Sequence, residues 1–82
     1  MTEIEYDILD ELYFPISFQA LAEESGVAEP ELSEVLPELV GKGWVKPLRT
    51  PDEEFADDSW RGGLASCYFL ATKEGLMEHN MR

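Results

Sequence analysis

The sequence is poor in cysteine, in long apolar runs and, over its first half, in positive charge. Its single cysteine, Cys67, cannot form an internal disulfide, which favours a reducing, cytoplasmic setting. No apolar run approaches the roughly 18 residues that a membrane span requires. The acidic N-terminus also lacks the basic start of a secretion signal. These absences argue against a disulfide-rich scaffold, a membrane protein and a secreted precursor.

Acidic residues dominate the charge, and they are distributed unevenly. The chain has 82 residues, with 18 acidic residues against 6 basic ones and a formal net charge of −12. Residues 1–41 hold 11 of the acids and no lysine or arginine, so every basic residue follows position 41. An acidic surface of this kind repels phosphate backbones and anionic lipid, and it attracts basic partners.

Length and composition predict one globular domain over residues 1–82. Hydrophobic residues make up 44% of the chain, which is ordinary for a folded protein and high for a disordered one. A chain of this length has room for a single modest core. The starting Met1 favours a complete small protein.

Apolar periodicity predicts a first helix that begins after Thr2. Thr2 and Glu5 have the spacing of a capping box, in which each side chain bonds the backbone amide of the other residue. We expect Pro15 to end this helix, because the residue before a proline is pushed out of helical geometry. The predicted buried stripe consists of Ile4, Ile8, Leu9, Leu12 and Tyr13.

Two further helices are predicted before the middle of the chain. Ser17 can cap the second helix, and Gly26 provides a left-handed end to it. The third helix is expected from about Pro30, which fits a first helical turn, to Gly41. Pro37 removes a backbone hydrogen bond inside that helix, and we expect a kink there. The predicted inner faces consist of Phe18, Leu21 and Ala22, and of Leu32, Val35, Leu36, Leu39 and Val40.

A β-hairpin and a last short helix are predicted for the second half. Trp44–Arg49 and Ser66–Ala71 have the composition of strands. A long acidic loop at about residues 50–64 separates them. Thr72 can cap the last helix, on which His79 is expected at the surface, near the negative end of the helix dipole.

Three segments, in this order and spacing, resemble the winged helix-turn-helix superfamily, especially its MarR-like and PadR-like regulators: ISFQALAEESGV, ELSEVLPELVGKGWV and YFLATKEGL. The resemblance covers nearly the whole chain. It implies a positioning helix, a recognition helix, a wing and a closing helix. The expected fold is therefore α+β, mainly α with a small β-hairpin, and the chain would be an acidic member of the superfamily.

The exposed face of the third helix is predicted to be acidic. In DNA-binding members of that superfamily this helix lies in the major groove. Here Glu31, Glu34 and Glu38 would face the groove and repel phosphate. We therefore predict a non-enzymatic regulatory or adaptor module that binds a protein partner with a basic surface. In one variant of this hypothesis the carboxylates mimic DNA phosphates.

Phe55 and Trp60 belong to the acidic loop, and two interpretations of them stay open. In the first, the loop is a docking segment whose acids steer it to a basic surface while the aromatic rings anchor in apolar pockets. In the second, it is a solvated wing tip whose aromatic rings pack back on the domain. The acids of this loop lack the spacing of an EF-hand, so no metal site is predicted.

The alternative function is a transcriptional regulator that binds DNA through the second half of the chain. Lys42, Lys46, Arg49 and Arg61 would then contact backbone phosphates, and affinity would fall steeply with salt. No serine has a histidine-containing constellation near it, and no cofactor motif is present, so catalysis has no support. The strand Ser66–Ala71 is apolar on both faces, which predicts either a cover from other parts of the chain or a homodimer surface.

Overall fold

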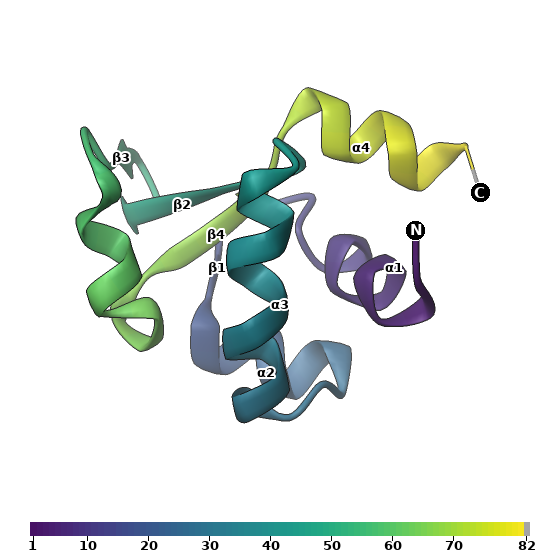
Figure 1. Ribbon diagram of the computed structural model, residues 1–82, viewed down its shortest axis with the longest axis horizontal. Coiled ribbons are helices and arrows are strands. Elements are labelled where there is room, and N and C mark those ends of the chain that lie inside the picture. The colour runs from purple at the N-terminus through teal and green to yellow at the C-terminus, as the bar shows by residue number, and fades with distance from the viewer. Residues whose placement is uncertain (82) are drawn as a thin grey trace.

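Four α-helices and a four-stranded antiparallel sheet build the domain over residues 1–81, the part of the chain that the computed structural model describes (Figure 1). This is a small α+β fold, as the composition and periodicity predict. No helix within these residues combines the length and the apolar character needed to cross a membrane. The elements in chain order are α1 (Glu3–Asp10), β1 (Ile16–Ser17), α2 (Phe18–Ser25), α3 (Glu29–Gly41), β2 (Val45–Thr50), β3 (Glu53–Glu54), 3₁₀ turns at Asp58–Gly62 and Leu64–Ser66, β4 (Tyr68–Ala71) and α4 (Lys73–Asn80).

The predicted capping box is present at the start of α1. The Glu5 amide donates to Thr2 Oγ1 at 3.1 Å, and the Thr2 amide donates to Glu5 Oε1 at 2.8 Å. The predicted end of the helix is wrong, because α1 stops at Asp10 rather than just before Pro15. The Leu12 carbonyl accepts from the Ala71 amide at 3.0 Å. This hydrogen bond attaches the segment after α1 to the end of β4, where its backbone is no longer helical.

The turn between α2 and α3 forms as the sequence predicts. Ser17 Oγ accepts from the Ala20 amide, and Gly26 ends α2 with a φ of 76°, a left-handed conformation that favours glycine. Val27 is buried in the turn. α3 then starts at Glu29 and continues through Pro37 as one helix to Gly41.

The sheet has the strand order β1-β4-β2-β3, so the last strand in the sequence lies between the first two. β4 pairs with β2 over the register Val45↔Ala71 to Leu48↔Tyr68. These strands confirm the predicted hairpin, although each begins one or two residues later than expected. The predicted loop at 50–64 contains additional structure, because the short strand β3 and a 3₁₀ turn form within it.

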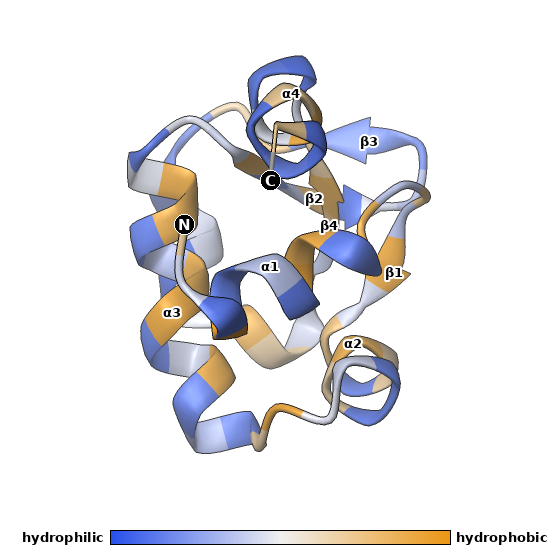
Figure 2. Ribbon diagram, turned by 90° about the vertical axis from the view of Figure 1, so that its right-hand side faces the viewer, coloured by the Kyte–Doolittle hydropathy of each residue, from blue (hydrophilic) through white to orange (hydrophobic). Residues whose placement is uncertain are grey.

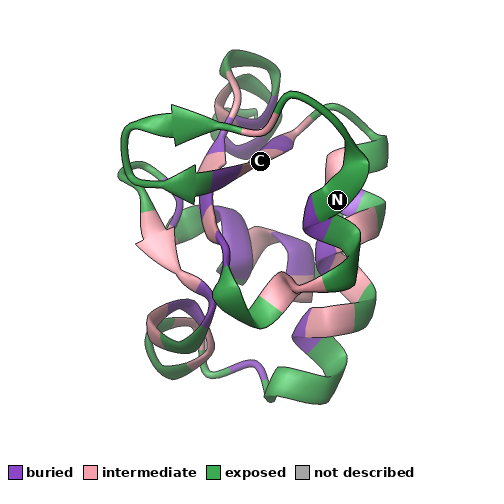
Figure 3. Ribbon diagram, turned by 90° about the vertical axis from the view of Figure 1, so that its left-hand side faces the viewer, coloured by how far each residue is buried: buried purple, intermediate pink, exposed green. Residues whose placement is uncertain are grey.

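The core lies where α1, α2 and α3 pack against one face of the sheet. Apolar residues turn inward on the helices, while hydrophilic residues cover their outer sides (Figure 2). Buried segments accordingly line the interior, and β3 is exposed at its edge (Figure 3). Along β4, Phe69 and Ala71 are buried and the alternate Tyr68 and Leu70 are only partly covered. The core residues are Ile8, Leu9, Leu12, Phe18, Leu21, Val27, Leu32, Leu36, Leu39, Val45, Trp60, Cys67, Phe69 and Ala71.

α4 closes the fold beside α1, and Figure 1 shows the N-terminus near the end of α4. Thr72 Oγ1 accepts from the Gly75 amide at 3.0 Å, as predicted for a helix cap. Gly75 is buried against the Trp44 carbonyl, where a methyl group would overlap the oxygen. The prediction of a surface His79 is wrong: its side chain is only 6% exposed, because the inner side of α4 packs on α1.

Candidate functional site

The outer side of α3 carries a row of three carboxylates. Glu31, Glu34 and Glu38 are all exposed. Leu32, Leu36 and Leu39, which alternate with them along the helix, are fully buried. Residues three and four positions apart share one side of a helix, so the row extends about 10 Å along the axis at 1.5 Å per residue. The structure thus brings these three predicted site residues together on one solvent-facing surface, here called the acidic α3 face.

No ion pair within residues 1–81 neutralises the acidic α3 face. The lysine and arginine ion pairs found in these residues involve Glu5, Glu53 and Glu54 instead. Lys42, at the end of α3, is directed to Glu5 of α1. The carboxylates of the face therefore form an uncompensated negative surface.

Trp60 is a core residue in this structure, which corrects the expectation of an exposed aromatic anchor. Its side chain is only 3% exposed and packs in the hydrophobic core. Phe55 is partly buried and packs against the same core. The loop aromatics thus follow the second interpretation, in which they pack back on the domain. Burial of this large ring removes apolar surface from water, which favours packing of the loop on the core.

Two open clefts, of about 290 and 300 Å³, flank these aromatic rings. The first lies between the side chains of β2 and the acidic loop, and the second extends toward Cys67. Phe55 and Trp60 contribute to both clefts. Their remaining lining residues are Lys46, Pro47, Glu54, Ala56, Asp57 and Asp58 in the first, and Arg49, Ser59, Gly63, Ser66 and Cys67 in the second.

One carboxylate of the loop has a local structural role. Asp57 Oδ1 accepts from the Ser59 amide at 2.9 Å and so caps the 3₁₀ turn at Asp58–Gly62. The hydrogen bonds from Ser59 hold the pKa of Asp57 below its usual range. This member of the acidic loop therefore stabilises the local fold of the loop.

The four basic residues proposed for DNA contacts are each engaged within the chain. Lys46 Nζ lies 3.8 Å from Glu54 Oε1, and Arg49 Nε lies 3.9 Å from Glu53 Oε1. The Arg61 guanidinium lies over the Trp60 ring at 4.4 Å from its centroid. Lys42, the fourth, pairs with Glu5. Lys46 and Arg49 belong to β2, Lys42 follows α3 and Arg61 lies in the 3₁₀ turn, and three of the four already face a carboxylate of their own chain.

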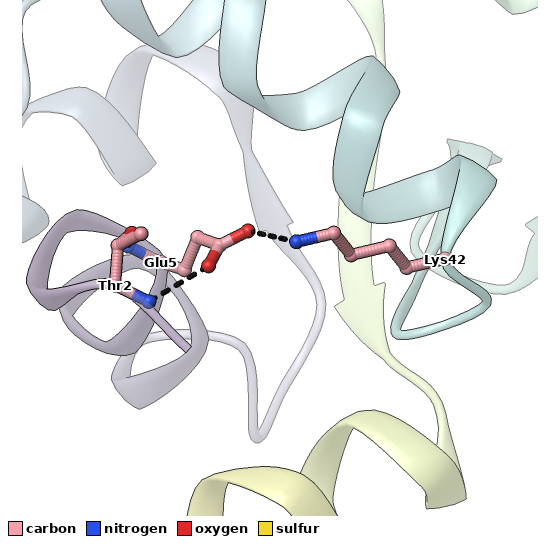
Figure 4. A network of polar contacts seen from close by, with 3 residues as sticks. All are labelled: Thr2, Glu5 and Lys42. Carbon is pink, nitrogen blue, oxygen red and sulfur yellow. Dashed lines mark hydrogen bonds and ion pairs between the residues drawn. The ribbon is translucent and has the colours of Figure 1, made fainter.

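The Glu5–Lys42 pair is the shortest of these ion pairs, and no local pattern in the sequence predicts it (Figure 4). Lys42 Nζ donates to Glu5 Oε2 at 2.6 Å, while the other oxygen of Glu5 holds the Thr2 amide. Burial alone would raise the pKa of Glu5, but the hydrogen bonds and charge of Lys42 and the hydrogen bonds from Thr2 outweigh it, and the pKa is lowered. The pair joins the start of α1 to the end of α3.

Cys67 has the environment of a structural thiol. Its Sγ donates to the Gly63 carbonyl at 3.3 Å, and burial raises its pKa, which disfavours the nucleophilic thiolate. Within residues 1–81, no three side chains of His, Cys, Asp or Glu converge in a group that could hold a metal ion.

Comparison of the chain with protein-family models, with curated proteins and with solved structures gave no match.

Proposed function

We propose that this domain is a winged helix-turn-helix module that binds a basic protein partner through the acidic α3 face. In this proposal α2 and α3 form the helix-turn-helix, and β2, β3 and the loop before β4 form the wing. The module is a regulatory or adaptor protein rather than an enzyme, and its partner is cytoplasmic.

The order of elements supports the winged-helix assignment. A helix and a short strand precede α2 and α3, and two longer strands and a closing helix follow them. The central position of β4 between β1 and β2 joins the strand before the helix pair to the hairpin after it. In this arrangement α3 takes the place of the recognition helix, with its outer side free.

The single observation that carries the function is the uncompensated row of Glu31, Glu34 and Glu38 on that helix. A recognition helix that reads DNA needs positively charged neighbours to hold the backbone. Here the nearby cations are directed to carboxylates of their own chain. The charge pattern favours a partner whose own surface is basic, including a DNA-binding protein whose phosphate sites the carboxylates would occupy.

Charge reversal of the acidic α3 face tests this proposal. The variant Glu31→Lys/Glu34→Lys/Glu38→Lys should lose at least about tenfold in affinity for the partner, because three attractions between carboxylates and the partner's basic surface become repulsions. The measurement is quantitative capture of proteins from a cell extract by the immobilised domain, followed by titration of the captured partner.

The matched control reverses three exposed acids away from α3, in Asp7→Lys/Glu74→Lys/Glu78→Lys. Both variants change the net charge equally, so equal losses would assign the effect to overall charge and contradict the proposed face. Titration of a labelled mixed-sequence duplex supplies the second arm. Wild-type binding that weakens steeply with salt would replace the proposal with DNA binding through Lys42, Lys46, Arg49 and Arg61.

A further inference from the structure

His79 lies in a closed environment between the first and last helices. Its ring stacks on Tyr6 of α1 at a centroid distance of 4.3 Å and meets the edge of Tyr13 at 5.5 Å. Its Nδ1 is 2.9 Å from the Tyr13 hydroxyl, and its Nε2 is 3.4 Å from Asp10 Oδ1. Nε2 is buried and has no well-formed hydrogen bond, so Asp10 is the charged group that faces it.

The proton of Tyr13 has two acceptors within reach. The hydroxyl lies 3.0 Å from Asn80 Oδ1 as well as 2.9 Å from His79 Nδ1, and a tyrosine hydroxyl has one proton to donate. When Tyr13 donates to Asn80, Nδ1 must donate to Tyr13. Asp10 is a carboxylate and only accepts, so Nε2 also needs a proton to face it favourably. A hydrogen bond from Tyr13 to Asn80 is therefore compatible with a His79 ring that is protonated on both nitrogens and positively charged.

The neutral ring has a different complete arrangement. If its proton is on Nε2, facing Asp10, then Nδ1 is an acceptor and the Tyr13 hydroxyl turns to donate to it. Asn80 is exposed, so its amide oxygen is then solvated by water at little cost. The other neutral form, with the proton on Nδ1, directs a buried lone pair at the Asp10 carboxylate and is disfavoured.

We propose that Asp10, Tyr13 and His79 form a proton-responsive clasp between α1 and α4. Protonation of His79 turns the Tyr13 hydroxyl from the imidazole to Asn80 and adds a charge pair with Asp10. The contribution of Asp10 to the packing of the two helices is therefore larger when the ring is protonated than when it is neutral. This inference is independent of the proposed protein-binding function.

The groups facing His79 determine the sign of the effect. Among the described contacts, the titratable groups are Tyr6 and Asp10 of α1 and Tyr13 of the following loop, and Asn80 on α4 is uncharged. Asp10 is the one that is charged at neutral pH. Its attraction is stronger for the protonated ring, which carries a full positive charge, than for the neutral ring, whose Nε2 proton it also faces. Asp10 therefore contributes more to stability when the ring is protonated.

Unfolding of the Asp10→Asn variant at two pH values tests the clasp. Measurements at about pH 5.5 and about pH 8 span the range in which histidine side chains change charge. We expect the substitution to raise the unfolding equilibrium constant about two- to fivefold more at the lower pH, the range for a partly exposed ion pair. The comparison between pH values cancels the effect of removing a carboxylate from the C-terminal end of α1, which is the same at both.

Asp7→Asn is the matched control, because Asp7 is exposed and also belongs to α1. It should show no such difference between the two pH values, and equal behaviour of the two variants would refute the clasp. Nitrogen NMR of the His79 ring in the wild-type protein gives a second, independent readout. We expect Nε2 to carry the proton in the neutral ring, and a neutral ring protonated on Nδ1 would overturn the exchange of the Tyr13 proton.

Discussion

The two halves of the chain differ in how their charges are paired. Residues 1–41, here called the helical half, contain α1, α2 and α3, and residues 42–81, here called the sheet half, contain β2, β3 and β4. In residues 1–41 the acids project to solvent on α2 and α3, and no lysine or arginine from the same half offsets them. In the sheet half, Lys46 and Arg49 on β2 lie beside Glu54 and Glu53 of the adjacent strand β3. The helical half therefore presents a negative surface, whereas in the sheet half the basic residues of β2 lie beside acidic residues of β3.

The comparison shows why net charge alone describes this protein poorly. A field from unpaired surface charges extends over about a Debye length, roughly 8 Å at physiological salt. Paired charges a few ångströms apart cancel at that range. The Glu5–Lys42 bond is the exception that joins the halves, because its carboxylate belongs to α1 and its ammonium follows α3.

The largest expected effect concerns the acidic loop between β2 and β4, whose aromatic residues pack in and against the core. Trp60→Ala should lower the free energy of unfolding by about 3–5 kcal/mol, because it removes a large buried ring from the core. Phe55→Ala should lower it by about 1 kcal/mol, since Phe55 is only partly covered and its site can be filled by water. Urea denaturation followed by circular dichroism measures both changes. Equal, small losses would show that this loop is not part of the core in solution.

The second effect is the loss of the bond between the halves. Glu5→Gln should lower the free energy of unfolding by about 1–3 kcal/mol, the range for a charged hydrogen bond. The pKa of Glu5 is lowered in the folded state, so its contribution is fully present above its ordinary value of 4.5 and is lost as pH falls below it. Wild-type stability should therefore converge on that of the variant in acid.

The control for Glu5 is Glu24→Gln, which neutralises an exposed acid of α2. That change should leave the free energy of unfolding within about 0.5 kcal/mol of wild type. A gap between wild type and Glu5→Gln that persists undiminished in acid would assign the effect to packing rather than to the charge.

Local chemistry made much of the helical half predictable. The capping box of Thr2 and Glu5, the cap at Ser17 and the left-handed Gly26 depend on neighbours within a few residues, and each forms as expected. The acidic α3 face was predictable for the same reason, because helical periodicity separates Glu31, Glu34 and Glu38 from the buried leucines.

The features that local patterns did not reveal depend on partners far along the chain. The Tyr13–His79 contact joins residues 66 positions apart, and the Lys42–Glu5 bond joins residues 37 positions apart. The chain bonds to Ala71 through Leu12 just after the early end of α1, and Trp60 is buried because its 3₁₀ turn packs against the core. No local pattern marks such pairs, since they arise only when tertiary packing brings the elements together.

The smallest expected effect tests the local neutralisation in the sheet half. Glu53→Gln/Glu54→Gln removes two long, exposed ion pairs, so the free energy of unfolding should fall by less than about 1 kcal/mol in total. This loss should shrink in about 1 M salt, where the Debye length is about 3 Å. Glu23→Gln/Glu24→Gln makes the same change of charge on α2, where relief of repulsion should leave stability unchanged or slightly raised at low salt. Thermal unfolding at low and high salt separates the two. If both double variants lose stability equally at low salt, the halves do not differ in how they compensate charge, and the acidic α3 face is no more available to the proposed basic partner than the acids of β3 are.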